Sequence, residues 1–307
     1  MPLIPDDYRY SVNNLEFMRR DSAEKRFKQV TRSALPLFLR GGDTITITPS
    51  VAGFHEDDVE SVIRWAARNG HGDFLIDIGA NIGLTSCLVG DCFSAVRCYE
   101  PNPLAFAILG VNTKIGIAPG VDVRLFNYGV GNENSTTELL VPKSNWGGAF
   151  VVQGNSYDQE TLLRKDGFRN FDEGNYIRQT VEIRTAESSL AQVFDEFRAQ
   201  GKRSGVIKID AEGFELSILE AVSGIVPADF GLVIVFENHM RDVTREQLVS
   251  LFRSRADLFL LDTRKVRGAT FVRYVRSILG AKRETRLRPV DEHLGKGNFV
   301  MIVRAQS

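Results

Sequence analysis

Residues 74–85 read FLIDIGANIGLT, and this stretch decides the fold. Its first five residues are a short apolar run of the kind that forms a fully buried parallel strand. Gly79 and Gly83 then mark a tight turn, and the segment from Asn81 onward is predicted to be a helix. A strand, a turn and a helix in this order bring backbone N–H groups and the positive end of the helix beside a ligand.

The glycine turn is the first candidate binding site. Gly79 allows the chain to turn where a side chain would clash, and Gly83 allows the helix to lie close to the strand or to a ligand. The side chain of Asp77, at the carboxyl end of the strand, is expected to face the same crevice. The candidate cofactor-binding residues of this motif are Asp77, Gly79, Ala80, Asn81 and Gly83.

The spacing of the glycines distinguishes between cofactors. The Gly-Ala-Asn-Ile-Gly turn lacks the second glycine of the G-x-G-x-x-G pattern, which lets the backbone approach the pyrophosphate of a dinucleotide. S-adenosylmethionine has no phosphate; it carries a carboxylate that suits the helix end and a cationic sulfonium that favours a nearby carboxylate such as Asp77. The turn therefore favours S-adenosylmethionine over NAD, and an ordinary strand-to-helix turn without a ligand is the alternative.

The composition is that of an ordinary globular protein. The chain has 307 residues, 43% of them hydrophobic and 25% charged, and its net charge of −1 gives no reason to expect a nucleic acid partner. A basic leader and an apolar run of membrane-spanning length are both missing from the sequence, so a cytoplasmic location is expected. Cys87, Cys92 and Cys98 lack paired C-x-x-C spacing, which favours buried free thiols over a metal site.

A second strand and its end supply the next candidates. Residues 95–103 read AVRCYEPNP, a strand ended by a carboxylate and two prolines. Glu100 follows Gly79 by about twenty positions, where this architecture holds the hydroxyl pair of a ribose. A strand-end glutamate in solvent is the alternative. We interpret Glu100 as a ribose-binding residue, with Pro101 and Asn102 beside it.

The order of elements predicts the fold class. A helix over 104–115 and a third strand and turn over 121–131 follow, and three such strand–helix units predict an α/β fold with a doubly wound, mostly parallel sheet. Asn127, Tyr128 and Gly129 would then sit at the carboxyl edge of that sheet, near an adenine ring.

The chain is predicted to have an N-terminal cap or lead-in over residues 1–54 and a main domain over 55–307. In the cap, a helix over 15–30 and a strand over 44–48 are expected. A helix opens the main domain, and His55 at its start is interpreted as a surface or capping residue in preference to a ligand contact.

Residues 132–180 change character and form a candidate substrate lid. A strand is expected at 136–141, followed by a long polar stretch with aromatic residues and glycines, and loops of that length usually have a function or move. The aromatic side chains can stack on a sugar or only anchor the loop, and both interpretations stay open. They are Trp146, Phe150, Tyr157, Phe168, Phe171 and Tyr176.

The second informative stretch, residues 205–215, reads GVIKIDAEGFE. It predicts another buried strand that ends in a carboxylate at the mouth of the sheet, where ligands bind in open α/β folds. Asp210 and Glu212 are the leading acidic candidates. Glu215 ranks below them, because acidic residues are favoured at helix starts for reasons of their own.

The remaining chain adds one further candidate group and a charged segment. A buried strand over 232–239 ends in Glu237 and His239, and the imidazole of His239 is a candidate proton acceptor. Strands over 258–261 and 299–303 flank a basic segment, which is expected to be a solvated face; contact with a phosphate-bearing acceptor is the minority hypothesis. Its cationic residues are Arg264, Lys265, Arg267, Arg273, Arg276, Lys282, Arg283, Arg286 and Arg288.

Three motifs, at residues 77–83, 99–103 and 207–215, together resemble the FkbM family of S-adenosylmethionine-dependent methyltransferases. The Ile-Lys-Ile-Asp-x-Glu-Gly-x-Glu block is the most specific of the three. The resemblance implies a class I, Rossmann-like methyltransferase sheet of seven strands with an antiparallel last strand. It also implies methylation of hydroxyl groups, on sugars of glycans or on natural products such as macrolides.

These observations predict an O-methyltransferase that uses S-adenosylmethionine and acts on a hydroxyl of a saccharide, glycan or glycosylated intermediate. A macrolide-type acceptor, an NAD-dependent oxidoreductase and a non-catalytic nucleoside-binding module are the alternatives. A base is needed because an alcohol is a poor nucleophile. The candidate catalytic residues are Asp210, Glu212, Glu237 and His239, with Asp210 also beside the cofactor. No obligatory metal is expected; a divalent cation held by the carboxylates is the alternative to His239.

Overall fold

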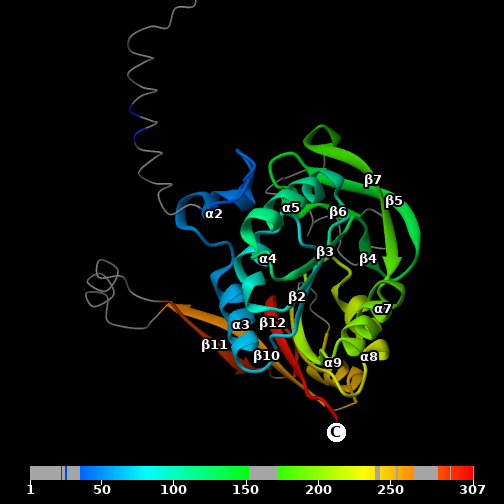
Figure 1. Ribbon diagram of the computed structural model, residues 1–307. Coiled ribbons are helices and arrows are strands. Elements are labelled where there is room, and N and C mark those ends of the chain that lie inside the picture. The colour runs from blue at the N-terminus through cyan, green and yellow to red at the C-terminus, as the bar shows by residue number, and fades with distance from the viewer. Residues whose placement is uncertain are drawn as a thin grey trace, which may run out of the picture.

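The computed structural model describes residues 35–151, 172–238, 243–253, 255–265, 283–290 and 292–306, together with Ser22 and Lys25. The rest of the helix expected over 15–30, the aromatic residues Tyr157, Phe168 and Phe171, and His239 lie outside the described residues. The main sheet (Figure 1) has eight strands. In spatial order they are β11 (Arg283–Pro289), β10 (Ala256–Lys265), β12 (Gly297–Val303), β9 (Gly231–Asn238), β8 (Ser204–Ile209), β1 (Phe74–Ile78), β2 (Ala95–Tyr99) and β3 (Asp122–Phe126).

Five neighbouring strands of this sheet, β3, β2, β1, β8 and β9, run parallel. Strand β1 lies at their centre and is buried at every position. A strand that is covered on both faces has no solvated side, which is why β1 is apolar without alternation at every position except Asp77. The doubly wound, mostly parallel sheet expected from the sequence is confirmed.

The other edge of the sheet is antiparallel. Strand β12 inserts between β9 and β10 and runs antiparallel to both, so the expected antiparallel last strand is confirmed. The expected count of seven strands is wrong by one, because β11 pairs with β10 at the edge. Leu287 of this strand packs against the core while Arg286 and Arg288 are exposed. Charged side chains on an edge strand prevent it from pairing with other chains. In the sequence the same charges made β11 look like part of a solvated basic segment, so the strand was not predicted.

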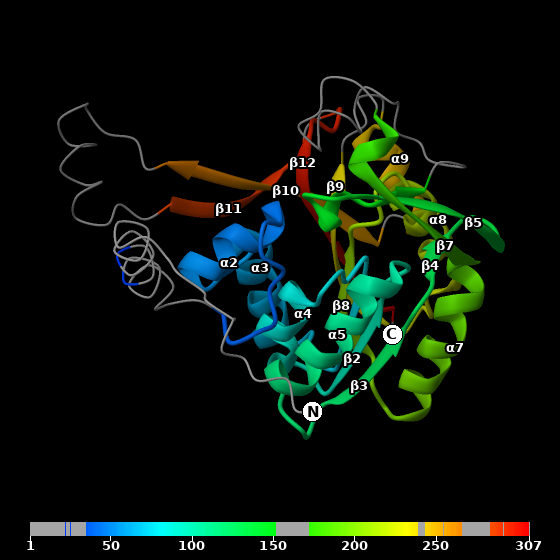
Figure 2. The ribbon, with the colours of Figure 1, turned by 90° about the horizontal axis from the view of Figure 1, so that it is seen from above.

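Helices cover both faces of the main sheet, as Figure 2 shows. One face packs against α3 (Asp57–Arg68), α4 (Leu84–Val89) and α5 (Pro103–Gly116). The other packs against α7 (Ala186–Ala199), α8 (Glu215–Ile225) and α9 (Arg245–Leu251). Alternate residues of each strand point to the two faces, so two separate apolar layers form.

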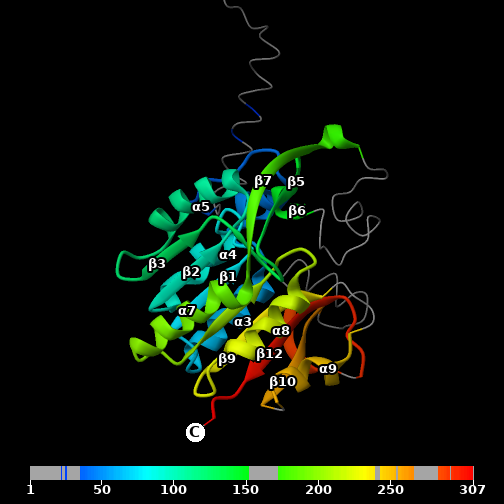
Figure 3. The ribbon, with the colours of Figure 1, turned by 90° about the vertical axis from the view of Figure 1, so that its right-hand side faces the viewer.

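A second sheet forms where a long loop was expected. Its strands, in spatial order, are β4 (Gly129–Gly131), β7 (Tyr176–Thr185), β5 (Ser135–Pro142) and β6 (Phe150–Val151). Figure 3 shows β5, β6 and β7 beyond one end of the main sheet. The strand expected at 136–141 is confirmed as part of β5, which pairs with β7 along its whole length. Residues 132–180 are therefore largely a sheet in their described part.

The N-terminal segment differs from its expected form. Residues expected as a strand form a 3-10 helix, η3 (Thr44–Thr46), and the short helix α2 (Ile47–Ala52). The carboxylate of Asp43 accepts a hydrogen bond from the backbone N–H of Ile45 at 3.2 Å, and this cap starts the helical turn despite the β-branched residues. Leu35 packs in one apolar cluster with Ile82 and Leu84, so this segment lies against the main domain.

Three further single-turn 3-10 helices complete the described elements: η4 (Gly90–Cys92), η5 (Trp146–Gly148) and η6 (Glu173–Asn175). Within the parts of the chain that the structure describes, every helix is too short or too polar to cross a membrane.

Candidate functional site

A cavity of about 270 Å³ lies where the strands β1, β2, β8 and β9 end. Its wall is built from the glycine turn after β1 with the start of α4, the ends of the neighbouring strands, and the residues at the start of α3. Ile45 of the N-terminal segment, the second sheet and the segment before β6 complete it. The carboxyl edge of a parallel sheet is where α/β proteins bind ligands, because strand ends, turns and helix starts meet there.

Close backbone contact explains the first glycine of the turn. Gly79 has φ +80°, and a Cβ atom added to it would lie 1.9 Å from the carbonyl oxygen of Asp210. The end of β8 therefore touches the turn directly, and only glycine fits there. Asn81 also has a positive φ, and α4 begins at Leu84; the helix expected from Asn81 onward thus starts three residues later.

The second glycine serves helix packing. Gly83 has φ +85° at the start of α4, and a Cβ atom there would lie 2.7 Å from Cδ1 of Leu109 in α5. The close neighbour is thus a helix and not the strand. Gly83 does not line the cavity, whereas Gly79, Ala80 and Asn81 do.

Glu100 connects the glycine turn to the end of β2. One carboxylate oxygen accepts a hydrogen bond from the backbone N–H of Asn81 at 2.8 Å, and the other accepts one from the N–H of Asn102 at 2.7 Å. Burial raises the pKa of Glu100 to about 7, although these two hydrogen bonds act in the opposite direction. Glu100 lines the cavity, so its remaining lone pairs are available to a ligand there.

A buried lysine lies between the two acidic motifs. The ammonium of Lys208 lies 3.0 Å from a carboxylate oxygen of Asp210 and 3.6 Å from one of Asp77. Burial opposes the charge of Lys208, but the carboxylates of Asp210, Asp77 and Glu56 outweigh it and raise the pKa of Lys208 above its usual value. Lys208 is therefore a cation at neutral pH and links the ends of β1 and β8.

Asp77 itself is turned away from the cavity. It is fully buried and accepts a hydrogen bond from the hydroxyl of Ser86 in α4 at 2.5 Å. Sequence reasoning expected Asp77 to face the ligand and gave Lys208 no role. Lys208 stands two residues before Asp210. Because alternate side chains of a strand point to the same face, this spacing could have predicted that Lys208 lies beside Asp210.

The start of α3 contributes two cavity residues that the sequence did not single out as site residues. His55, expected as a surface or capping residue, and Glu56 both line the cavity. Burial and the charge of Lys208 lower the pKa of His55 to about 4. Burial and the charge of Asp210 raise the pKa of Glu56 to about 7. Packing of α3 against β8 and β9 brings these residues to the acidic motif, and no local pattern marks such a contact.

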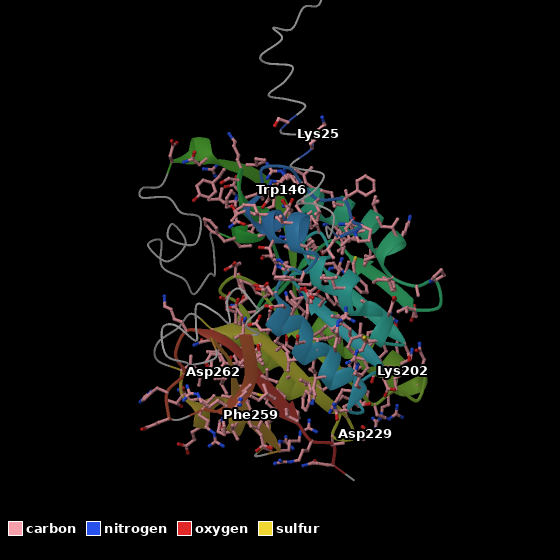
Figure 4. All side chains as sticks on the ribbon, turned by 90° about the vertical axis from the view of Figure 1, so that its left-hand side faces the viewer. Lys25, Trp146, Lys202, Asp229, Phe259 and Asp262 are labelled. Carbon is pink, nitrogen blue, oxygen red and sulfur yellow. The ribbon has the colours of Figure 1, made fainter. Side chains whose placement is uncertain are left out.

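The segment between β5 and β6 forms part of the cavity wall. Asn145, Trp146 and the following glycines line it, and Figure 4 shows Trp146 between the N-terminal segment and the second sheet. The guanidinium of Arg40 lies 4.4 Å from the centre of the Trp146 ring. The buried Asp43 carboxylate accepts a hydrogen bond from the backbone N–H of Trp146 at 3.1 Å. The N-terminal segment thus holds Trp146 in place.

Three buried polar atoms in the cavity wall have no hydrogen-bond partner among the described residues: Oδ1 of Asn81, Oδ1 of Asn145 and Nε1 of Trp146. Two are acceptors as the amides are oriented, and one is a donor. An unsatisfied buried polar atom costs about 1 to 3 kcal/mol. A polar ligand in the cavity can remove that cost.

Most of the sequence-predicted site residues converge on this cavity. Those that line it are Gly79, Ala80, Asn81, Glu100, Pro101, Gly129, Asp210, Glu212 and Glu237. Those outside its wall are Asp77, Gly83, Asn102, Asn127 and Tyr128. Asn127 donates a hydrogen bond to the backbone carbonyl of Glu100 at 2.9 Å, and Tyr128 packs against Tyr99. Both residues therefore contact cavity-lining residues without lining the cavity themselves. Of the lid aromatics, Trp146 and Phe150 line the cavity.

Cys87 and Cys98 are buried free thiols, and Cys92 is a partly exposed one. Burial raises the pKa of Cys87 to about 12. In the described part of the chain, no three His, Cys, Asp or Glu side chains are grouped so that they could hold a metal ion.

The similarity of this chain to known proteins includes the region of the three sequence motifs. The model of the methyltransferase FkbM domain matches residues 77–279, more than half of the chain. Methyltransferase sdnD from Sordaria araneosa is 28% identical over 160 residues, which cover 48% of this chain and 60% of that protein. Methyltransferase 1 from Beauveria bassiana (strain ARSEF 2860) is 22% identical over 151 residues, which cover 48% and 58%. The match therefore spans less than two thirds of these curated relatives.

Solved structures with low similarity include the SAM-dependent methyltransferase from Agrobacterium tumefaciens, at 9% identity and a TM-score of 0.38, covering 82% of this chain and 64% of that one. The precorrin-6y C5,15-methyltransferase from Geobacter metallireducens GS-15 has 13% identity and a TM-score of 0.34, covering 80% and 89%. The family expected from the three sequence motifs is confirmed by the domain match over residues 77–279, and this chain belongs to the FkbM family of methyltransferases.

Proposed function

We propose that this protein transfers a methyl group from S-adenosylmethionine to a hydroxyl oxygen of a saccharide or glycosylated intermediate. FkbM family membership supports S-adenosylmethionine as the cofactor. The observation that carries the proposal is a single cavity with two different walls. The glycine turn and Glu100 line one part of it, and the carboxylates of Asp210 and Glu212 after β8 and of Glu237 near the end of β9 line the other.

The first wall fits S-adenosylmethionine. The Glu100 carboxylate would accept hydrogen bonds from the ribose hydroxyls, with Pro101 and Gly129 bordering the adenine. The unsatisfied polar atoms of Asn81 and Trp146 would pair with the amino-acid part of the cofactor. When bound, the cofactor supplies an electrophilic methyl group on a cationic sulfur, and nearby carboxylates favour that cation.

The second wall fits a hydroxylated acceptor. Asp210, Glu212 and Glu237 would accept hydrogen bonds from its hydroxyl groups, and Trp146 and Phe150 would cover the apolar face of a sugar ring. His239, which directly follows Asn238 at the end of β9, stays a candidate for the same wall. Holding the hydroxyl in line with the methyl group removes much of the entropic barrier.

Two measurements test the proposal. Calorimetry with S-adenosylmethionine, S-adenosylhomocysteine and NAD should give binding of the first two and none of NAD; tight binding of NAD alone would contradict it. Transfer of a tritiated methyl group should then be assayed on methyl glycosides, glycans, polyols and a macrolide alcohol. Transfer to the macrolide alone would replace the saccharide by the other acceptor class.

A further inference from the structure

Glu56 occupies an unusual place in the cavity. It precedes the first turn of α3, about 150 residues before the acidic motif, yet it faces the ends of β8 and β9. It lines both the main cavity and a small neighbouring one, which it shares with Lys208, Asp210 and Glu237. None of the family motifs recognised in the sequence includes it.

The Glu56 carboxylate is poorly paired. Among the described residues it accepts no hydrogen bond and forms no ion pair with lysine or arginine, and it does not cap α3. Within the described part of the chain, the one basic nitrogen within 4.0 Å of it is Nε2 of His55, at 4.0 Å. Since the pKa of His55 is lowered to about 4, that imidazole is neutral at pH 7 and does not stabilise the Glu56 carboxylate as a cation would.

The neighbouring acidic residue is in a different state. Asp210 lies 3.0 Å from the ammonium of Lys208, whose second close contact is Asp77 at 3.6 Å. The charge of Asp210 is thus already compensated by a buried ammonium, whereas no lysine or arginine nitrogen among the described residues lies within 4.0 Å of the Glu56 carboxylate. Of Asp210 and Glu56, Glu56 is therefore better suited to take up a proton.

We propose that Glu56 is the proton acceptor for the acceptor hydroxyl, an inference that rests on the proposed methyl transfer. As the hydroxyl oxygen forms its new bond to the methyl carbon, the electron pair of the broken carbon–sulfur bond stays on sulfur. The hydroxyl proton passes to the Glu56 carboxylate. The products are a methyl ether, S-adenosylhomocysteine and protonated Glu56, whose side chain is 38% exposed and can return its proton to water.

The charges around Glu56 suit this role. His55 and Asp58 face it from its own segment, Lys208 and Asp210 from β8 and the turn after it, and Glu237 from β9. Burial and the negative charges of Asp210 and Glu237 raise the pKa of Glu56 to about 7, and Lys208 opposes them. A general base is most effective when its pKa lies near the working pH.

Kinetics provide the first test. The assay uses saturating S-adenosylmethionine, so that protonation of Glu100 does not limit the rate through cofactor binding. Under this condition kcat/KM for a methyl glycoside should rise with pH, with a midpoint near 7. Glu56→Gln should lower it by roughly two to four orders of magnitude and abolish that midpoint, while affinity for S-adenosylmethionine is kept. Asp57→Asn is the matched control: it changes an exposed carboxylate in the same turn that does not line the cavity, and it should behave as wild type.

Titration provides a second readout that needs no turnover. In protein labelled with ¹³C-glutamate and bound to S-adenosylhomocysteine, the carboxyl signal missing from Glu56→Gln should titrate near 7 in the wild type. A midpoint near the ordinary glutamate value of about 4.5, or wild-type turnover in Glu56→Gln, would overturn the assignment. If the wild type binds S-adenosylhomocysteine but methylates none of the glycosides, the saccharide proposal fails, and the titration alone then judges Glu56.

Discussion

At the scale of single residues, Glu100 has the best-defined position in the proposed cofactor half of the site. Both of its carboxylate oxygens are fixed by backbone N–H groups, one from the glycine turn and one from the start of α5. It therefore presents a rigid acceptor pair and joins two motifs that are separate in the sequence.

Replacing Glu100 should weaken cofactor binding. Glu100→Ala removes the carboxylate that we propose accepts hydrogen bonds from the two ribose hydroxyls, and we expect a loss of about 1 to 3 kcal/mol in binding of S-adenosylmethionine by calorimetry. Glu187→Ala, which removes an exposed carboxylate at the start of α7, should leave the dissociation constant unchanged. An unchanged constant in Glu100→Ala would remove Glu100 from the ribose site.

The ionisation of Glu100 should also be visible in stability. Its pKa is about 7 in the folded protein against 4.5 ordinarily, so its stabilising contribution is complete below pH 4.5 and is lost as the pH rises through 7. Glu56 has a raised pKa as well and acts with the same sign. These two groups favour a higher melting temperature near pH 5, whereas His55, whose pKa is lowered to about 4, favours a higher one near pH 8. Glu100→Gln removes one of the contributions at low pH, so it should lower the melting temperature at pH 5 relative to that at pH 8 when compared with the wild type. An equal difference in both proteins would contradict the buried, raised-pKa state of Glu100.

At the scale of elements, the junction of β1 with β8 determines the shape of the cavity. The turn after β1 contacts the Asp210 carbonyl at the end of β8. The Lys208 ammonium links the same two strands, because it lies between the carboxylates of Asp77 and Asp210. The N-terminal segment and the second sheet close the cavity from the opposite side, through Asp43 and Trp146.

Gly79→Ala should be much more damaging than an ordinary glycine substitution. Both Gly79 and Gly70 have positive φ angles, but a Cβ atom meets nothing within 4 Å at Gly70, whereas at Gly79 it would overlap the Asp210 carbonyl. Gly70→Ala should cost about 1 to 2 kcal/mol of unfolding free energy from backbone strain alone. Gly79→Ala should cost several kcal/mol more in chemical denaturation, or leave the protein unfolded. Similar costs for the two variants would show that the close approach does not exist.

The Asp43 carboxylate should act as a positioning group for Trp146. It is buried and accepts hydrogen bonds from Ile45, Trp146 and Arg40. Asp43→Ala should lower stability by about 1 to 3 kcal/mol. If Trp146 contacts the acceptor, the variant should also raise the acceptor KM more than it lowers kcat, with partial rescue by Asp43→Asn. Lower stability with unchanged KM would limit Asp43 to a structural role.

At the scale of the whole molecule, the cavity is surrounded by parts of the chain that are distant in sequence. Ile45 from the N-terminal segment, Phe150 from the second sheet, and Glu237 from β9 all line it. A ligand that fills such a cavity contacts several layers of the fold at once and binds the folded state only.

Ligand binding should therefore stabilise the whole protein. At about one hundred times its dissociation constant, S-adenosylhomocysteine should add roughly 2.7 kcal/mol to the unfolding free energy and raise the melting temperature by several degrees. The same excess of NAD should leave the melting temperature unchanged. A rise with NAD and none with S-adenosylhomocysteine would contradict the choice of cofactor that the glycine spacing favoured.

The sequence by itself determined the parts of this protein that depend on neighbours along the chain. The apolar run 74–78, the turn at Gly79 and the carboxylates after β2 and β8 are local patterns, because strand burial, positive φ and strand-end chemistry are set within a few residues. Since parallel strands end at one edge, these local patterns were enough to predict that Gly79, Glu100 and Asp210 share one site, and all three line the cavity.

Only the tertiary structure decided the rest, because it depends on contacts between distant segments. Lys208 is an ordinary strand residue until Asp77 and Asp210 surround it, and Glu56 is an ordinary helix-start residue until α3 packs against β8 and β9. The second sheet and β11 likewise exist only through pairing with strands elsewhere in the chain. Burial and neighbouring charge set the pKa of a side chain, and both are properties of the folded molecule.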